Sequence, residues 1–464
     1  MRLRIPLLLV VTALVITGCG AEKDSSAPTK TREDNASTFA LDVDTASYTF
    51  AARQLNDGAW PDASTVRPEE FLNAFDHHYA QPRGDGFAMH VDGARLPEAH
   101  TGSSSSRLLR IGLQTKSESS SERRDANLTF VIDVSGSMAE AGKLDLVQDA
   151  LHYLVDQLQP SDAVAIVAFN DKASVIREMT RVSDKARLHE AIDRLKAAGS
   201  TNLGAGLTSG YGLARESFRE RATNRVIILS DGLANTGTTN ASTLVNRIQE
   251  EAAKEISLLG VGVGSDYGDK LMEELADKGD GFVVYISEQK QARELFVRKL
   301  PAALTVRAYD AKAQVVFDRS AVDTYQLIGY EDRRLEDNEF RDDTVDGGEI
   351  GPGHSVTALY LVKLRANASG RVAQVKVRWL DPKTRDASES YETVNVDDID
   401  GTFARSDADL KVCYAAAYFA EALRQRTAPS FDELAKIADD ANEELDDPKV
   451  GELATLIRKA AQRR

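Results

Sequence analysis

One short stretch of this sequence places an acid and two hydroxyls together at the end of an apolar run. The stretch reads LTFVIDVSGSMAE over residues 128–140, and its polar side chains include Asp133, Ser135 and Ser137. Three kinds of chemistry use such residues: a turn whose side chains bond the backbone, a nucleophile, or a metal site with oxygen ligands. The stretch alone leaves all three open, so the choice depends on which residues the fold brings beside it.

Two later segments carry side chains of the same chemical kind. The loop GSTN at 199–202 contains Thr201, and the strand-like run RVIILS at 225–230 is followed directly by Asp231. Together the three segments supply two carboxylates and several hydroxyls, with no histidine or cysteine among them. An all-oxygen set suits a hard cation such as Mg²⁺ or Mn²⁺, with waters in the remaining positions, whereas Zn²⁺ prefers nitrogen and sulfur ligands.

The segments that must position these residues alternate between strand-like and helical patterns over residues 126–300. Apolar recurrence at three- and four-residue spacing predicts a helix over 143–158, and Ser183 is expected to cap the next helix. The strands are continuous apolar runs, which is typical of strands covered by helices on both faces. We therefore predict a doubly wound, mostly parallel, six-stranded α/β sheet, which binds ligands at the carboxyl ends of its strands. The expected strands are 128–133, 163–169, 225–230, 256–263 and 282–286, with an edge strand at 173–179.

The regions on either side of this α/β domain have different patterns. Residues 301–403 alternate in polarity and predict a β-rich, sandwich-like region, and residues 404–464 predict helices. Residues 38–125 predict a helix and two short strands. Two strands do not form an independently stable sheet, so we expect these early strands to complete the β-rich region, with the α/β domain inserted between them.

The N-terminus has the features of a secretory signal. Residues 1–18 contain two arginines and then an apolar stretch that is too short to span a bilayer. The stretch ends in ITGC at 16–19, which resembles a bacterial lipobox and implies that Cys19 is lipidated; a plain signal peptide with an incidental cysteine is the alternative. Residues 19–37 are polar and predict a flexible tether. We expect an extracytoplasmic protein anchored by lipid to the bacterial cell membrane, and to the outer membrane if the cell has one, because Gly20 is not the aspartate associated with inner-membrane retention.

Composition excludes several classes of function. The chain has 464 residues, 28% of them charged, and a formal net charge of −16, which argues against nucleic-acid binding because that requires a basic surface. No G-x-x-x-x-G-K-[ST] motif occurs, so a nucleotide site of the P-loop type is not expected. If Cys19 carries lipid, Cys413 has no partner for an intrachain disulfide and is expected to be a small buried residue.

The five oxygen-bearing positions together resemble a known site. D-x-S-x-S on the first strand, a threonine in a later loop and Asp-Gly after the next long strand are similar to the metal-ion-dependent adhesion site of von Willebrand factor type A (VWA) domains. The resemblance implies that the serines and the threonine contact a divalent cation (Mg²⁺, or Mn²⁺ or Ca²⁺), while the aspartates contact it directly or through water. It also implies that a Glu or Asp of a protein partner fills a remaining position. The matching positions here are Asp133, Ser135, Ser137, Thr201 and Asp231.

The resemblance extends beyond the α/β domain. Segments such as STFALDVDTASYT, VRPEEFLNAF, RLLRIGLQTK and DDTVDGGEIGPGHSVTALY are similar to bacterial YfbK-type VWA lipoproteins. This similarity covers most of the chain after the tether. It implies an envelope protein. Because the site is of the adhesion type and lacks the residues that catalysis would need, we expect a protein that is not an enzyme and that acts in adhesion, assembly or scaffolding.

Two alternative functions stay open. In a metal-independent envelope scaffold, the D-x-S-x-S residues would only satisfy backbone groups of a turn. A Mg²⁺-dependent phosphatase resembling the haloacid dehalogenases has D-x-D-x-[TV], but Ser135 stands where the second aspartate is needed. A serine hydrolase is disfavoured because the first glycine of G-x-S-x-G is missing and no histidine accompanies a plausible acid. The pair His77 and His78 could also hold a transition metal, although a surface or packing role is the stronger interpretation.

Overall fold

A computed structural model describes most of the chain after the tether. The predicted signal segment 1–18 and Cys19 lie outside the described residues. Over the described ranges, no helix combines the length and the apolar character needed to cross a membrane. The described residues are 35–97, 103–117, 124–232, 241–252, 254–264, 275, 282–286, 288–296, 306–345, 347–382, 384–425 and 430–463.

The α/β region contains a six-stranded sheet with the order β6-β5-β4-β7-β8-β9. Neighbouring strands are parallel except for β5 and β6, which are antiparallel. Strand β5, which follows β4 in the chain, lies on one side of β4 in the sheet, and the later strand β7 lies on its other side. The strand order therefore reverses between β4 and β7. The predicted doubly wound, mostly parallel sheet is confirmed. The strands are β4 (Ala126–Asp133), β5 (Ala163–Phe169), β6 (Ala173–Arg181), β7 (Thr223–Ser230), β8 (Ile256–Val263) and β9 (Phe282–Ile286).

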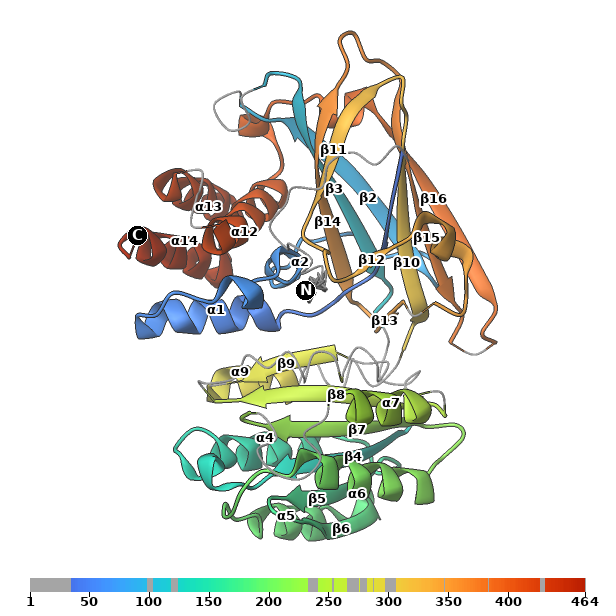
Figure 1. Ribbon diagram of the computed structural model, residues 1–464, viewed down its shortest axis with the longest axis vertical. Coiled ribbons are helices and arrows are strands. Elements are labelled where there is room, and N and C mark those ends of the chain that lie inside the picture. The colour runs from blue at the N-terminus through green and yellow to red at the C-terminus, as the bar shows by residue number, and fades with distance from the viewer. Residues whose placement is uncertain are drawn as a thin grey trace, which may run out of the picture.

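Helices cover both faces of this sheet (Figure 1). One core cluster joins α4 (Leu144–Gln157), α5 (Lys185–Asp193) and α9 (Gln289–Glu294) to one face. A second cluster joins α6 (Leu203–Glu216) and α7 (Ala241–Ala252) to the other face. Every residue of β4 is buried, as expected for a strand between two helical layers.

The expected cap of α5 is wrong. Asp184 is the residue before the helix, and no side chain caps it. Ser183 lies in the preceding 3₁₀ turn η3 (Val182–Asp184), where its backbone N–H donates to the carbonyl of Pro160 at 3.2 Å. The additional turn moves the start of the helix beyond the reach expected for Ser183.

Two antiparallel sheets pack face to face to form a sandwich. The first has the order β12-β1-β10-β15-β16, with β13 also paired to β10, and the second has the order β11-β14-β3-β2. A shared apolar core that includes Phe39, Ile111 and Val375 lies between them. The first sheet contains β1 (Ala36–Ala40), β10 (Ala308–Phe317), β12 (Arg334–Leu335), β13 (Gly348–Ile350), β15 (Arg371–Leu380) and β16 (Ala387–Asn395). The second contains β2 (Phe87–Arg95), β3 (Ser106–Thr115), β11 (Val322–Ile328) and β14 (Ser355–Leu364).

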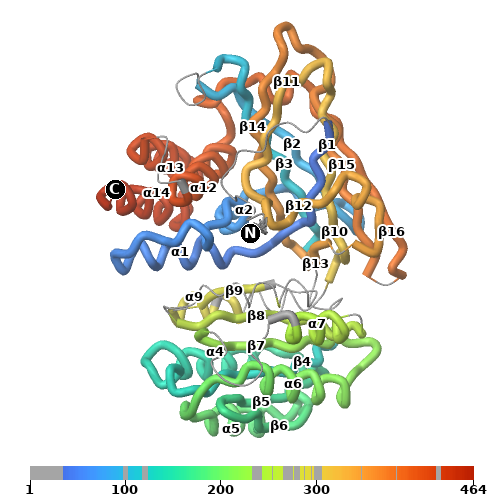
Figure 2. Tube along the Cα trace, in the orientation of Figure 1, coloured from blue at the N-terminus to red at the C-terminus, as the bar shows by residue number. Residues whose placement is uncertain are grey.

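Strands from the segments before and after the α/β region make up this sandwich (Figure 2). The early strand β3 pairs along its whole length with β14, from Ser106 opposite Lys363 to Gln114 opposite Ser355. The short strand β1 pairs with β10 in the other sheet. The α/β region therefore lies, in sequence, between segments that belong to one sandwich.

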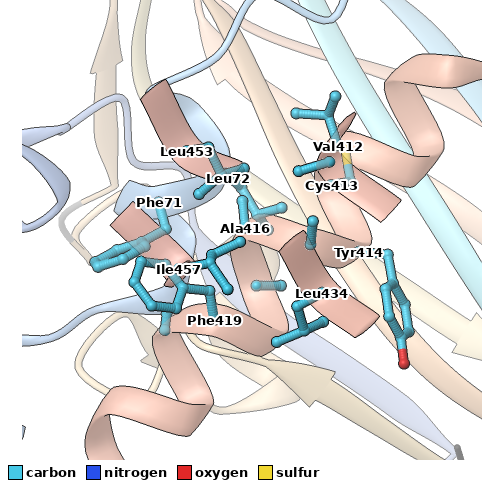
Figure 3. Packing of buried hydrophobic residues seen from close by; sticks show 14 of the residues in the cluster. Phe71, Leu72, Val412, Cys413, Tyr414, Ala416, Phe419, Leu434, Leu453 and Ile457 are labelled. Carbon is cyan, nitrogen blue, oxygen red and sulfur yellow. The ribbon is translucent and has the colours of Figure 1, made fainter. Parts of the chain in front are cut away.

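A helical layer covers the outer side of the second sheet. It combines α1 (Ala46–Asp57) and α2 (Pro68–Asn73) with the C-terminal helices α12 (Ala408–Gln425), α13 (Phe431–Leu445) and α14 (Pro448–Ala461). Figure 3 shows Phe71 and Leu72 of α2 among apolar side chains of the C-terminal helices. Cys413 is buried in the same cluster, as predicted.

Helix α1 also contacts the α/β region. Phe50 packs edge-on against Tyr285 of β9, with ring centroids 6.3 Å apart. The backbone N–H of Val283 donates to Asp44 Oδ1 at 3.2 Å. These contacts cover the edge strand β9, which would otherwise offer unpaired backbone groups.

Candidate functional site

The carboxyl end of β4 places Asp133 in a fully buried position lined by donors. Asp133 is 0% exposed; its Oδ1 accepts the backbone N–H of Ser135 at 2.8 Å, and its Oδ2 accepts the Ser230 hydroxyl at 2.6 Å. Burial raises the pKa of this carboxyl above its ordinary value, and these hydrogen bonds offset part of that rise. The donors fix the orientation of Asp133 at the point where the crossovers of the sheet diverge.

The two serines of the motif are brought together by a short turn. The 3₁₀ turn η2 (Gly136–Ala139) follows Ser135 directly, so the chain folds back after the strand. The hydroxyl oxygens of Ser135 and Ser137 lie 3.1 Å apart, and Ser137 Oγ donates to Asp231 Oδ1 at 3.0 Å. Asp231 follows β7, so this bond joins two neighbouring strand ends.

The spacing of these oxygens fits a small hard cation. Mg²⁺ holds oxygen ligands at about 2.1 Å in an octahedron, which places adjacent ligand oxygens roughly 2.9 Å apart. The separations of 3.1 Å and 3.0 Å along Ser135, Ser137 and Asp231 are close to that value. The residues present therefore fit the ion that the sequence motif predicts, and their role as ligands stays a prediction.

The loop that carries Thr201 is tied to the first loop by backbone hydrogen bonds. Gly136 N–H donates to the carbonyl of Gly199 at 2.8 Å, and Ala198 N–H donates to the carbonyl of Val134 at 2.7 Å. Gly199 has a φ of +82°, and a Cβ at this position would come within 2.4 Å of Asp171 Oδ2. This conformation needs glycine. Thr201 itself is buried, at 4% exposure, next to these ties.

The helix after this loop starts at a side-chain cap. Asn202 precedes α6, and its side chain accepts the backbone N–H of Ala205 at 3.0 Å. The cap fixes where α6 begins, directly after Thr201. Thus two strand ends, β4 and β7, the turn η2 and the start of α6 position the five predicted residues.

A lysine that the sequence motif did not identify completes the cluster. Lys143 Nζ donates to Asp231 Oδ2 at 2.8 Å and lies 2.9 Å from Glu140 Oε2. Its side chain is only 6% exposed. Burial alone would lower the pKa of Lys143, but the hydrogen bonds to Asp231 and Glu140 raise it above its ordinary value. The ammonium therefore stays charged and partly neutralises Asp231.

Glycine at the end of β8 leaves room for this lysine. A Cβ at Gly264 would come within 2.8 Å of Lys143 Cε.

The sequence gives a weak signal for Lys143, which is a cation directly before an amphipathic helix and close to two acids. Ser230 was visible beside Asp231, but its bond to Asp133 depends on the pairing of β4 with β7.

The alternative histidine site is not assembled. His77 is buried and its Nε2 lies 2.9 Å from the carbonyl oxygen of Leu72, whereas Nδ1 of His78 lies 3.1 Å from Asp409 Oδ1. The two rings therefore bond different partners. In the part of the chain that the structure describes, no group of three or more His, Cys, Asp or Glu side chains is arranged to hold a metal ion. The cluster at β4 has only two carboxylates and depends on hydroxyls for its remaining oxygens.

Three family models match this chain. Residues 127–298 match the von Willebrand factor type A domain, residues 302–372 match the C-terminal region of the uncharacterized protein YfbK, and residues 21–103 match a von Willebrand factor model. The first match contains all five predicted site residues. The other two fall on segments that supply the sandwich and the helical layer.

Two related proteins and one solved structure are also similar to this chain. YfbK of Escherichia coli, strain K12, is 32% identical over 380 residues, which cover 75% of this chain and 65% of YfbK. The uncharacterized protein sll0103 of Synechocystis is 29% identical over 205 residues, covering 43% of this chain and 48% of that protein. The chain therefore spans less than two thirds of the length of these relatives. The solved structure of a von Willebrand factor type A protein from Catenulispora acidiphila superposes with a TM-score of 0.50 at 18% identity, covering 79% of this chain and 90% of that one.

Proposed function

This chain is a von Willebrand factor type A domain protein related to YfbK, and we propose that it binds a protein partner through a divalent cation. The cation, Mg²⁺ or the similar Mn²⁺ or Ca²⁺, would lie at the carboxyl ends of β4 and β7. The proposed ligands, direct or through water, are Asp133, Ser135, Ser137, Thr201 and Asp231. The protein is not an enzyme in this proposal, and its site serves adhesion, assembly or scaffolding.

The observation that carries this proposal is the spacing of three side-chain oxygens, which is close to the spacing of adjacent ligands around an octahedral Mg²⁺ ion. Ser135, Ser137 and Asp231 come from two separate loops, yet their oxygens follow one another at 3.1 Å and 3.0 Å. A turn needs only its own backbone satisfied, whereas Ser137 contacts a carboxylate 94 residues away and so joins two loops. A cation shared by the two loops fits this arrangement.

The charge of the cluster favours an incoming acid. The cluster has two carboxylates, and Lys143 offsets one of them at 2.8 Å. A bound divalent ion then keeps an unbalanced positive charge, which attracts a carboxylate from outside. The ion would supply electrostatic attraction and a coordination position, while the protein's hydroxyls hold it without saturating its charge. A Glu or Asp side chain of a partner protein matches this requirement.

The proposed location follows from the N-terminus. We propose that Cys19 carries lipid and that the segment between it and the start of β1 at Ala36 holds the folded regions outside the cytoplasm, at the bacterial cell membrane. The outer membrane is the proposed location in a cell that has two. A membrane-bound receptor with a cation-dependent site fits this arrangement.

A metal-independent scaffold is the second candidate, and one observation favours it. Both oxygens of Asp133 accept hydrogen bonds, and both oxygens of Asp231 have partners, in Ser137 and Lys143. The cluster is therefore satisfied by protein groups alone, as a purely structural loop connection would be.

The two candidates differ in their response to chelation. We expect cross-linking in intact envelopes to join the chain to a specific partner in Mg²⁺ but not in EDTA. The variant Asp133→Ala should lose that partner, whereas Asp323→Ala, which removes an exposed carboxylate of β11, should keep it. Partner capture that survives both EDTA and Asp133→Ala would favour the scaffold. Phosphatase turnover that disappears in Asp133→Ala would instead favour a hydrolase.

A further inference from the structure

Helices α4 and α5 each present a histidine followed four residues later by an aspartate. These pairs are His152 with Asp156 on α4 and His189 with Asp193 on α5. The two helices pack side by side on one face of the sheet, within the same core cluster. Residues four apart lie on the same side of a helix, so the four side chains meet where the helices face each other.

The contacts between the helices are crossed. His152 Nε2 lies 3.1 Å from Asp193 Oδ1, and His189 Nε2 lies 3.3 Å from Asp156 Oδ1. The first contact is a hydrogen bond, and because an ionised carboxylate only accepts, Nε2 of His152 carries the hydrogen in it. In a neutral imidazole the other ring nitrogen then has a free lone pair, which here is Nδ1 of His152.

The two Nδ1 atoms face each other at close range. They are 2.6 Å apart, the ring centroids of His152 and His189 are 4.9 Å apart, and the ring planes differ by 21°. The distance between the ring centroids exceeds the distance between the two Nδ1 atoms by about two ring radii. Both Nδ1 atoms therefore lie on the line that joins the two centroids. The rings therefore meet edge to edge. The contact is a hydrogen bond, in which Nδ1 of His189 donates to the lone pair on Nδ1 of His152.

We propose that His152 and His189 form a second metal site, for a transition-metal ion that imidazole favours, such as Zn²⁺, Ni²⁺ or Cu²⁺. Without the ion, the hydrogen bond between the Nδ1 atoms satisfies the pair. Binding puts the ion in place of the hydrogen between these atoms and forms two metal–nitrogen bonds; the displaced hydrogen moves to Nε2 of His189, where Asp156 accepts it. Water fills the remaining coordination positions.

The surroundings fit such an ion in two respects, after a movement of the rings. Tetrahedral Zn²⁺ with nitrogen bonds of about 2.0 Å needs its two nitrogens roughly 3.3 Å apart with both lone pairs aimed at one point, so the rings must separate and turn. Both histidine side chains are about 30% exposed, which leaves them free to move and open to solvent. Asp193 and Asp156 remain on the far nitrogens, as carboxylates do behind metal-binding histidines, and their two charges balance a divalent ion. Lys185, 3.8 Å from Asp156, is the nearby cation that shares this carboxylate.

The site differs in chemistry from the oxygen cluster at β4 and is testable independently of it. The full chain, purified in detergent and stripped of metal, would be titrated with Zn²⁺ and Ni²⁺ by calorimetry in excess Mg²⁺. We expect one Zn²⁺ per chain. His152→Ala and His189→Ala should each weaken binding by tenfold or more, and Asp193→Asn by about tenfold. His90→Ala, which removes a half-buried histidine of β2, and Asp133→Ala should leave Zn²⁺ binding unchanged.

Two results would overturn the proposal. One is a wild-type chain that takes up none of Zn²⁺, Ni²⁺ or Cu²⁺ at millimolar concentration, because the pair would then hold only a proton. The other is unchanged Zn²⁺ affinity in both His152→Ala and His189→Ala, with circular dichroism showing that the variants are folded. Asp193→Asn keeps both imidazoles, so a loss of affinity in that variant cannot come from a missing ligand.

Discussion

The oxygen cluster at the end of β4 and the core beneath α12 are both buried, but they treat polar groups in opposite ways. In the oxygen cluster, Lys143 pairs with Asp231, and hydroxyls donate to both carboxylates. On the side of α2 and α12, Glu69 and His77 are buried, and among the described residues neither the carboxylate nor the ring has an ion-pair partner. Glu69 accepts the backbone N–H of Tyr330, and His77 lies against the carbonyl of Leu72 and the thiol of Cys413. The first arrangement accommodates charge and is open to a further ion, whereas the second stabilises neutral forms.

The pKa shifts follow this difference. Burial, and next the nearby Glu331, raise the pKa of Glu69 from 4.5 to about 7. Burial, and next the charge of Arg110, lower the pKa of His77 from 6.5 to about 4. Both shifts favour the uncharged group. Lys143 shows the contrary behaviour, since its carboxylate partners keep it charged despite burial.

The largest expected effect belongs to the apolar side of this comparison. Phe71 is 0% exposed and packs against Tyr48 and Phe419, with ring centroids 5.3 Å and 6.1 Å away. Replacing it with alanine should cost about 3–5 kcal/mol, because the cavity lies between α2 and α12 and neither can fill it. Chemical denaturation with and without Mg²⁺ measures the effect. The loss should be the same in both conditions, and a Mg²⁺-dependent loss would contradict the separation of core and site.

The next expected effect is on the pH dependence of stability, to which Glu69 and His77 contribute in opposite directions. The folded chain binds the Glu69 proton more tightly than the unfolded chain, so this residue's contribution to stability falls as pH rises from about 4.5 to 7. For His77 the unfolded chain binds the proton more tightly, so stability falls as pH drops from about 6.5 to 4. Each difference corresponds to about 3 kcal/mol, and in the wild type the two slopes largely cancel.

Single variants should expose these slopes. Glu69→Gln leaves the His77 effect, so its stability should rise between pH 4 and 6.5. His77→Gln leaves the Glu69 effect, so its stability should fall between pH 4.5 and 7. Urea midpoints at a series of pH values measure both. Parallel pH profiles in the two variants would show that these groups are not held neutral in the core.

A smaller effect is expected from the lysine of the oxygen cluster. Lys143→Met keeps an apolar stem beside Gly264 but removes the charge next to Asp231. The more negative site should bind Mg²⁺ several-fold more tightly, which corresponds to about 1 kcal/mol. Calorimetric titration with Mg²⁺ provides the measurement, and Lys143→Arg is the control that should keep wild-type affinity. Weaker binding in Lys143→Met would show that the lysine positions Asp231 rather than moderating its charge.

The α/β sheet was predictable from sequence because its strands are contiguous apolar runs and its helices have clear spacing. The residues at the strand ends were predictable for the same reason, since parallel strands bring their carboxyl ends to one edge. The register of β3 against β14 was not, because pairing across that separation depends on packing between two sheets. The contacts of Lys143 and the meeting of His152 with His189 also depend on tertiary packing that no local pattern encodes. The predicted cap at Ser183 failed because an additional 3₁₀ turn precedes the helix.

The most direct test of the account is Mg²⁺-dependent melting of the wild type and Asp133→Ala. If the dissociation constant is about 0.1 mM, then about 10 mM Mg²⁺ adds roughly 2.7 kcal/mol, which raises the melting temperature of a domain of this size by about 5–10 °C. Thr201→Val, which removes only a hydroxyl, should reduce this rise. If a cation binds at the end of β4, the melting temperature of the wild type should be higher in Mg²⁺ than in EDTA, and that of Asp133→Ala should be the same in both. Equal curves for the wild type in Mg²⁺ and EDTA would contradict a cation site at the end of β4.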